Sequence, residues 1–370
     1  MNELERFHAC MAYQEVDHAP FWNWGPWEET AERWKREGHR PDVDQPDREC
    51  DGYTAAAWFN PTPAFERKII AEDENTISYV TSEGSVIREM KAFGGSSMPQ
   101  FIRFPVETRE DFRQYWRQRM NPDLTQRVGS NWKERLQSAR RPDRPFFAWG
   151  NLWAGFFGPL RNLVGVERLC ELFYDDPAFL EEMMDADADF TIAVMSQILD
   201  VVAVDAFWFW EDMAYKTAPL VSPDLARRYM FPRYRRVVDY LVGRGVKYFA
   251  LDSDGHIDPL IPVWMDAGIN ILFPFEAQAG MDVLAVRRKY GRTLRMFGGV
   301  DKRTLAKGPA AIDAELARLK PLIEEGGYIP HTDHMIPPDV SFQDYCHYMA
   351  RLQETCGKRW SRPNLPIACC

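Results

Sequence analysis

The sequence predicts an α/β protein, a (β/α)₈ (TIM) barrel with an N-terminal insertion that contains a β-hairpin. Two observations indicate this fold class. Short apolar runs alternate with helical segments over most of residues 145–355, and nearly every run ends in acidic, amide or histidine side chains. Such alternation is typical of a parallel sheet, and 370 residues suit one barrel with insertions. We therefore expect a single domain over residues 1–370.

The N-terminal segment predicts one strand with its helix. Apolar residues recur at helical spacing from Leu4 until the chain reaches Pro20. "PFWNW" (20–24) is then predicted as the first strand, and "EETAERWKREG" (28–38) as a helix that ends in glycine.

Residues from about 40 to 140 interrupt this rhythm. "TISYVTSEGSVIREMKAFGG" (76–95) alternates β-branched and polar residues around a Glu-Gly turn, which predicts a hairpin. We expect this region to be an insertion or a side layer of the same domain.

The alternation resumes at Pro145 and stays regular. The predicted strands are "RPFFAWGNLW" (144–153), "DAFWFWEDM" (205–213), "KYFALDSDG" (247–255), "NILFPFEAQAG" (270–280), "LRMFGGVDK" (294–302) and "GGYIPHTDH" (326–334). The helical segments between them cover 167–199, 223–245, 258–268, 283–291 and 312–326. With "PFWNW" these make seven strands, and the sequence does not place the eighth. An open doubly wound sheet is the alternative.

Composition excludes several classes of protein. Hydrophobic residues make up 45% and charged residues 27% of the chain, the balance of a globular protein. A net charge of −10 without a dense basic cluster argues against nucleic acid as a partner. No apolar run is long enough for a membrane span and the start is unlike a signal peptide, so we expect a cytoplasmic protein. Seven scattered cysteines predict reduced thiols, with Cys369 and Cys370 in a frayed tail.

Polar side chains where the apolar runs end predict a site, because the carboxyl ends of barrel strands meet at one mouth. Asp252 and Asp254, two residues apart, can both point there, and two such carboxylates need a cation, a proton or a substrate donor between them. The predicted metal ligands are Asp252, Asp254, Glu276 and His334, and the predicted catalytic residues are Glu211, Asp252, Glu276 and His331. Helix caps and locally bonded histidines are the simpler interpretation of each residue alone.

Tryptophans cluster near the same strand ends. The chain has thirteen of them, more than composition leads one to expect, and such residues either pack in the core or line a pocket for a flat or apolar ligand. The predicted substrate-binding residues are Asn23, Trp24, Trp149, Asn151 and Trp208.

The chain resembles the uroporphyrinogen decarboxylase superfamily over nearly its whole length. The segments that carry the resemblance are "ERFHACMAYQEVDHAPF", "LVSPDLARRYMFPRYRRVV" after a strand ending in "EDM", "FGGVDKRTLAKGP", and "GGYIPHTDHMIPPDVSFQDYCHYM". The resemblance implies a TIM barrel with its active site at the carboxyl ends. True decarboxylases carry an Arg-x-x-Gly-Arg-Tyr type segment after the first strand, where this chain has "WNWGPWEETAERW". Without those arginines the carboxylates of a porphyrinogen lack counter-charges.

The resemblance points instead to the corrinoid-linked methyltransferases of the superfamily. In those acting on coenzyme M, a His-x-Cys pair and a later Cys bind zinc; here Asp252-Ser253-Asp254 and His334 stand at those places. An oxygen and nitrogen set implies a divalent metal, zinc or a harder ion, that polarises an ether oxygen. The resemblance thus implies a methyltransferase of O-demethylase type, with a small methoxylated or methylated substrate such as an aromatic methyl ether. Its corrinoid would arrive on a partner protein.

Two alternatives stay open at this point. One is a decarboxylase or lyase of the same family that uses no metal. The other is a non-catalytic barrel that binds a corrinoid protein. The sequence also leaves the oligomeric state open, a homodimer included.

Overall fold

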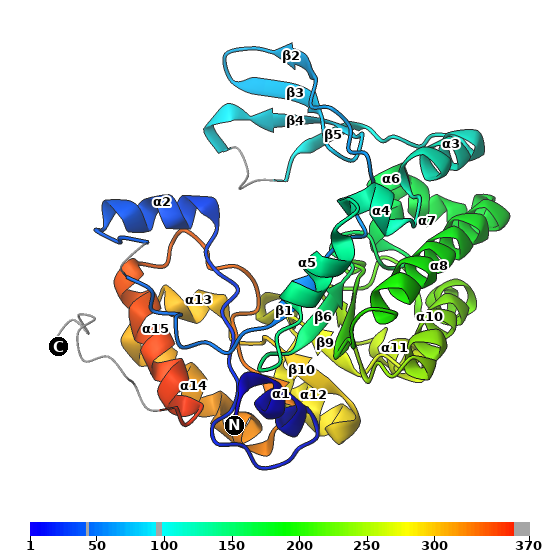
Figure 1. Ribbon diagram of the computed structural model, residues 1–370. Coiled ribbons are helices and arrows are strands. Elements are labelled where there is room, and N and C mark those ends of the chain that lie inside the picture. The colour runs from blue at the N-terminus through cyan, green and yellow to red at the C-terminus, as the bar shows by residue number, and fades with distance from the viewer. Residues whose placement is uncertain (42–43, 94–97, 359–370) are drawn as a thin grey trace.

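A computed structural model describes residues 1–41, 44–93 and 98–358. Its centre is a curled seven-stranded sheet in the order β1-β6-β7-β8-β9-β10-β11, in which every neighbouring pair is parallel (Figure 1). The strands are β1 Thr54–Ala56, β6 Phe146–Trp149, β7 Ala206–Trp210, β8 Tyr248–Asp252, β9 Ile271–Phe273, β10 Arg295–Phe297 and β11 Tyr328–Ile329. The six strands predicted after Pro145 are therefore confirmed, and the chain is an α/β protein with a parallel sheet.

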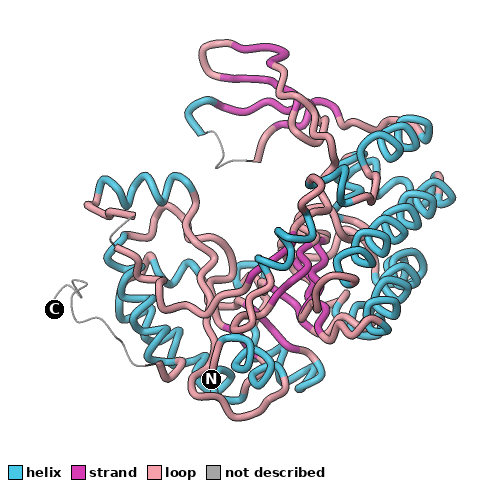
Figure 2. The backbone as a smooth tube through the Cα atoms, in the orientation of Figure 1, coloured by secondary structure: helices cyan, strands magenta, loops and turns pink. Residues whose placement is uncertain are grey.

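Helices surround this sheet on its outer side (Figure 2). Their bounds are α1 Glu3–Met11, α2 Glu28–Arg36, α3 Arg109–Arg119, α4 Leu124–Val128, α5 Trp132–Ala139, α6 Gly158–Val164, α7 Val166–Asp175, α8 Pro177–Leu199, α9 Pro223–Leu225, α10 Phe231–Gly243, α11 Ile261–Ala267, α12 Val283–Tyr290, α13 Lys302–Leu305, α14 Pro309–Glu325 and α15 Phe342–Thr355. A π-helical turn, Ala226–Met230, joins α9 to α10. The segment predicted as helical over 167–199 is two helices, because Asp176 caps the Phe179 N–H and Pro177 starts α8.

The prediction of a strand at "PFWNW" is wrong in detail. Residues 20–24 belong to no helix or strand; the Trp22 N–H donates to the Pro330 carbonyl at 3.2 Å, and the Phe21 carbonyl accepts from the Asp51 N–H at 3.1 Å. The segment thus contacts the chain next to both edges of the sheet. Its isolated bonds, rather than a continuous series, are the reason it is not a strand.

The region 40–140 contributes to two sheets. The predicted hairpin is confirmed as β3 Thr76–Val80 and β4 Val86–Met90, which pair antiparallel. Two flanking strands that the sequence did not reveal, β2 Ile69–Glu72 and β5 Gln100–Arg103, complete a four-stranded sheet that stands apart from the main body (Figure 1). β1 lies in the same region of sequence but pairs with β6. Its three residues, "TAA", are too short and too weakly apolar to read as a strand.

Two apolar clusters stabilise the main body. The larger one fills the space between the sheet and its helices, and the smaller one lies on the inner face of the curled sheet. Phe7, Cys10 and Met11 of α1 belong to the inner cluster, and the Cys10 carbonyl accepts from the Gly327 N–H at 2.8 Å, just before β11. α1 therefore covers the end of the sheet where the strands begin.

Two expectations concern the cysteines and membrane-spanning helices, and both can be compared with the described residues. Cys10, Cys50, Cys170, Cys346 and Cys356 are all free thiols. The Cys369 and Cys370 pair lies outside the described residues. In the described part of the chain, no helix has both the length and the apolar character needed to cross a bilayer.

Candidate active site at the carboxyl ends of the parallel strands

An aromatic cavity of about 210 Å³ lies where the parallel strands end. We call it the aromatic cavity; its lining residues are Trp22, Asn23, Trp24, Tyr53, Trp149, Trp208 and His331. They come from the extended segment before α2, the residue before β1, strands β6 and β7, and the loop after β11. Four of the five predicted substrate-binding residues, and the predicted catalytic His331, thus share one cavity.

Contacts between rings hold the cavity walls in place. The ring centroids of Trp208 and Phe273 are 4.0 Å apart in an edge-to-face arrangement, and those of Trp149 and Trp208 are 6.0 Å apart. Trp24 contacts Phe273 at 5.6 Å and His331 at 5.0 Å. Pairs in these geometries add about 0.5–1.5 kcal/mol each beyond burial, so the walls are preformed.

Asn151 is the predicted substrate-binding residue that does not line the cavity. It adopts a left-handed conformation with φ +53°, and its side-chain amide donates to Asn60 Oδ1 at 3.1 Å. The chain turns sharply after β6, so the period-two alternation that would have carried Asn151 inward stops at Trp149. Asn23 lines the cavity but is also bonded locally, to Asp47 Oδ2 and to the Gly25 N–H.

His331 presents a neutral imidazole to the cavity. Its Nδ1 lies 2.7 Å from the Thr332 carbonyl oxygen, which assigns the proton to Nδ1 and leaves a lone pair on Nε2. Burial lowers the pKa of His331 to about 4. The ring therefore stays neutral at physiological pH and offers a hydrogen-bond acceptor.

Five carboxylates gather beside the aromatic cavity, and we call them the mouth acids: Asp212, Asp252, Asp254, Glu276 and Asp333. Asp252 is the last residue of β8, and strand alternation places it on the same face as Ala250 of the inner cluster. Burial raises the pKa of Asp252 well above its ordinary value, and the negative charges of Asp254 and Asp212 add to the shift. Asp254 thus disfavours the ionisation of Asp252.

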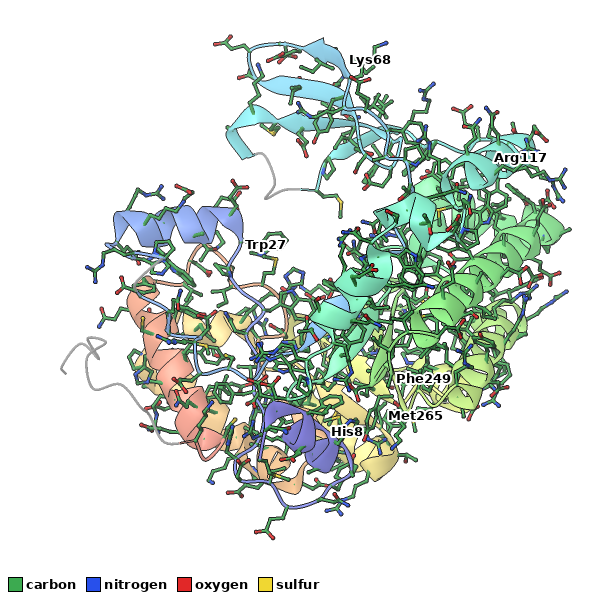
Figure 3. All side chains as sticks on the ribbon, in the orientation of Figure 1. His8, Trp27, Lys68, Arg117, Phe249 and Met265 are labelled. Carbon is green, nitrogen blue, oxygen red and sulfur yellow. The ribbon has the colours of Figure 1, made fainter. Side chains whose placement is uncertain are left out.

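Asp254 and His334 connect the mouth acids with the aromatic cavity. Asp254 Oδ2 lies 3.6 Å from His334 Nε2, too long for a good hydrogen bond, and burial together with the charges of Asp212 and Glu276 raises the pKa of Asp254 well above its ordinary value. The His334 ring stacks on Trp24 and on Trp27, at centroid distances of 6.4 and 5.2 Å. Trp27 precedes α2 (Figure 3). Trp24 is therefore shared between the cavity and the acids.

Lys302 is a site residue that sequence reasoning missed. Its Nζ lies 3.2 Å from Glu276 Oε1 and 3.9 Å from Asp333 Oδ1. Burial opposes ionisation of Glu276, but Lys302, with bonds from the Gln278 amide and the Gly255 N–H, lowers its pKa overall. Asp333 accepts from the Ala277 and Lys302 N–H groups, and burial raises its pKa to about 6. The signal in the sequence was the Lys after Asp301 in "GGVDK", where Asp301 itself caps α13.

The predicted metal ligands do not fit a zinc ion as they stand. Glu276 is already held by Lys302, and Asp254 and His334 are in ion-pair rather than chelating geometry. Among residues 1–41, 44–93 and 98–358, no group of three or more His, Cys, Asp or Glu side chains is arranged to hold a metal. The Lys302 ammonium supplies positive charge to two of the mouth acids, where the sequence suggested a metal ion.

Glu211 lies behind the mouth and holds a loop. Its fully buried carboxylate accepts from the N–H groups of Phe156, Phe157 and Gly158 at 2.6–3.0 Å and from the Tyr234 hydroxyl. Burial raises the pKa of Glu211 to about 7. With these donors in place, both oxygens are occupied, and the geometry assigns Glu211 to anchoring the start of α6 rather than to the catalysis predicted for it.

Comparisons with known proteins agree with this architecture. No curated protein sequence matches the chain. A solved structure of a methyltransferase from Methanosarcina mazei superposes with a TM-score of 0.61 at 17% identity, covering 96% of this chain and 99% of that one. A B12-independent methionine synthase from Shewanella sp. W3-18-1 in complex with selenomethionine gives a TM-score of 0.37 at 11% identity, covering 79% of this chain and 74% of that one. This TM-score is too low to carry an argument.

The first of these similarities shows the fold alone. The sequence model of the uroporphyrinogen decarboxylase (URO-D) family matches residues 157–354, more than half of the chain. This match covers β7 to β11, the strands that carry the mouth acids. The chain belongs to the uroporphyrinogen decarboxylase family.

Proposed function

We propose that this chain is a methyltransferase that moves a methyl group from a small methylated molecule to a reduced corrinoid on a partner protein. The aromatic cavity carries the proposal. Its volume of about 210 Å³ exceeds the roughly 150 Å³ of an engineered apolar cavity that takes up benzene, so a small ring or a branched methylated group fits. The methyltransferase from Methanosarcina mazei shows that this fold can house methyl transfer.

We also infer a closed (β/α)₈ barrel in which residues 20–24 take the place of the eighth strand. The bonds from Trp22 to Pro330 and from Asp51 to Phe21 support this, since they join the segment to the chain beside β11 and β1. Closure would bring Asn23 and Trp24 to the mouth opposite Trp208. Both residues line the aromatic cavity with Trp208, as closure requires.

The residues around the cavity define the chemistry that this chain can supply. Aromatic walls exclude water and orient the methyl-bearing group, and neutral His331 accepts a hydrogen bond from a substrate. Asp252 and Asp254, whose pKa values are raised by burial and by neighbouring negative charges, can pair with a proton or with a positively charged group of the substrate.

The decarboxylase alternative is not favoured by the site. Pockets for drug-sized ligands span roughly 300–1,000 Å³. A tetrapyrrole is at least as large as such a ligand, so the aromatic cavity of about 210 Å³ is too small for it. The mouth acids would also repel those carboxylates.

Methyl transfer to free cob(I)alamin tests the proposal. Purified protein is mixed with chemically reduced cobalamin and one donor at a time, 2-methoxyphenol or choline, and methylcobalamin is followed by its absorbance. We expect enzyme-dependent methylcobalamin with at least one donor, and at least tenfold less with Trp149→Leu. The exposed Tyr174→Ala variant is the control, with wild-type activity expected. No methylcobalamin above the protein-free rate with either donor would contradict the proposal.

A further inference from the structure

The charges at the mouth do not balance. Among the described residues, the ion pairs of the mouth acids involve only Lys302, Arg161 and His334. Arg161 is taken by Asp212 at 2.7 Å, and Lys302 by Glu276 and Asp333. Asp252 and Asp254 are left without a fully charged partner. These two carboxylates can therefore pair with a positively charged ligand.

The cavity tryptophans differ from other tryptophans of the molecule in having no cation of the protein over their rings. Elsewhere in the molecule the protein's own cations lie over tryptophan rings, as Arg161 does over Trp210 at 5.1 Å and Arg135 over Trp58 at 5.8 Å. In the described part of the chain, no Arg or Lys lies over any aromatic ring of the aromatic cavity. Tryptophan is the aromatic residue that attracts cations best.

Trp24 and Phe273 connect the cavity tryptophans with Asp252 and Asp254. Trp24 lines the aromatic cavity and stacks on His334, the partner of Asp254. Phe273 touches both Trp24 and Trp208 and is the register partner of Asp252 across β8 and β9. Asp252 and Asp254 thus lie beside the aromatic walls.

We propose that the aromatic cavity binds a methylated onium cation, a small quaternary ammonium or sulfonium group, with Asp252 and Asp254 as its counter-charges. The inference deepens the proposed function by naming the chemical class of the substrate. A soft, weakly hydrated cation suits tryptophan faces, whereas a hydrated metal ion would need oxygen ligands that point at one centre. A neutral methyl ether would give the carboxylates of Asp252 and Asp254 no positively charged partner.

An onium donor also makes the transfer step simple. The bond between the methyl carbon and the nitrogen or sulfur breaks, and its electron pair stays on that atom, which leaves as a neutral tertiary amine or thioether. The electron pair for the new bond to the methyl carbon would come from the reduced corrinoid named in the proposed function. No proton has to reach the leaving group, so the carboxylates serve to hold the cation in place.

Titration calorimetry of the protein without any corrinoid tests the inference. The probes are choline, trimethylsulfonium, the neutral carbon isostere 3,3-dimethylbutan-1-ol, and 2-methoxyphenol. We expect choline or trimethylsulfonium to bind about tenfold or more tightly than the isostere, since a desolvated cation over aromatic faces gains on the order of 2 kcal/mol. The tighter of the two cations then identifies nitrogen or sulfur. Equal or tighter binding of the isostere or of 2-methoxyphenol would overturn the inference.

Two variants separate charge from packing. Asp254→Asn should weaken choline at least fivefold and leave the isostere unchanged. Trp149 is half-buried at a strand end, and Trp149→Leu should abolish the preference for the cation over the isostere. Trp58 is also half-buried but packs on Trp132 outside the aromatic cavity, so Trp58→Leu should keep that preference. Loss of the isostere along with choline in Asp254→Asn would overturn the role of charge. Binding without methyl transfer would contradict only the proposed function, and methyl transfer from 2-methoxyphenol without choline binding only this inference.

Discussion

The two ends of the parallel sheet handle buried charge in opposite ways. Where the strands begin, below α1, the buried Arg6 guanidinium donates to Asp17 at 2.8 Å and to Asp51. The hydrogen bond from Arg6 holds the pKa of Asp17 well below its usual range. Where the strands end, burial and mutual repulsion raise the pKa values of Asp252 and Asp254 instead.

The difference separates stability from function within one sheet. A charge that only has to be buried is given a partner, because an unpaired buried charge costs several kcal/mol. Carboxylates that remain without a partner in a folded protein cluster where a ligand or a reaction needs them. The unpaired carboxylates at the mouth lower the stability of the free protein but can bind a cation, whereas the paired carboxylates at the opposite end cannot.

Breaking the paired end should have the largest effect. Arg6→Met removes the guanidinium from buried Asp51 and leaves it only His18, at 3.4 Å, so we expect the free energy of unfolding to fall by about 3–5 kcal/mol. Urea denaturation at pH 7 measures it. Arg117→Met, which removes an exposed ion pair with Glu110, should change stability by less than about 1 kcal/mol. Similar losses in the two variants would contradict the account of this end.

Glu211 tests whether a carboxylate at the strand ends can also be structural. In Glu211→Gln an amide NH₂ group faces backbone N–H donors, so we expect a loss of about 1–3 kcal/mol in the free energy of unfolding. The amides of Phe156, Phe157 and Gly158 should also exchange faster with deuterium. Unchanged stability together with unchanged exchange would show that Glu211 is not an anchor.

Asp254 should give the smaller, pH-dependent effect. Its folded pKa is raised, so its contribution to stability is fully present below its ordinary value of 3.8 and is lost as the pH rises through the folded pKa. We expect the wild-type melting temperature to decrease between pH 4 and pH 8 more steeply than that of Asp254→Asn. At pH 8 the variant should be at least as stable as the wild type. A variant that is less stable at pH 8 would mean that Asp254 has a cationic partner in the free protein.

Metal removal should have the smallest effect. Because Lys302 occupies Glu276 and the other predicted ligands do not converge, we expect dialysis against 1,10-phenanthroline to leave choline affinity and melting temperature unchanged. A fall in either that zinc restores would show that the mouth acids rearrange around a metal.

Sequence reasoning reached the cavity because strand ends are visible in a sequence. Trp149 ends β6 and Trp208 stands two residues before the end of β7, and strand alternation turns both inward, so both could be placed near the mouth. Asn151 could not be placed, because a single left-handed residue redirects the chain. Lys302 was overlooked because the residue before it, Asp301, is readily interpreted as a helix cap.

The role of Glu211 was beyond the sequence for a different reason. Its partners are backbone N–H groups of residues 156–158, more than fifty positions away, and no side-chain pattern reports a backbone donor. β1 was missed since pairing with β6, rather than the propensity of three residues, makes it a strand. Tertiary contacts decide such cases.

Proton release on ligand binding tests the central claim most directly. If the mouth acids lack a counter-charge, a bound cation should lower the pKa values of Asp252 and Asp254 and drive protons into solution. Calorimetric titration of choline at pH 6, repeated in buffers of different ionisation enthalpy, counts those protons. The account predicts a net release that becomes smaller in Asp254→Asn. Choline binding with no release, or with proton uptake, would contradict it.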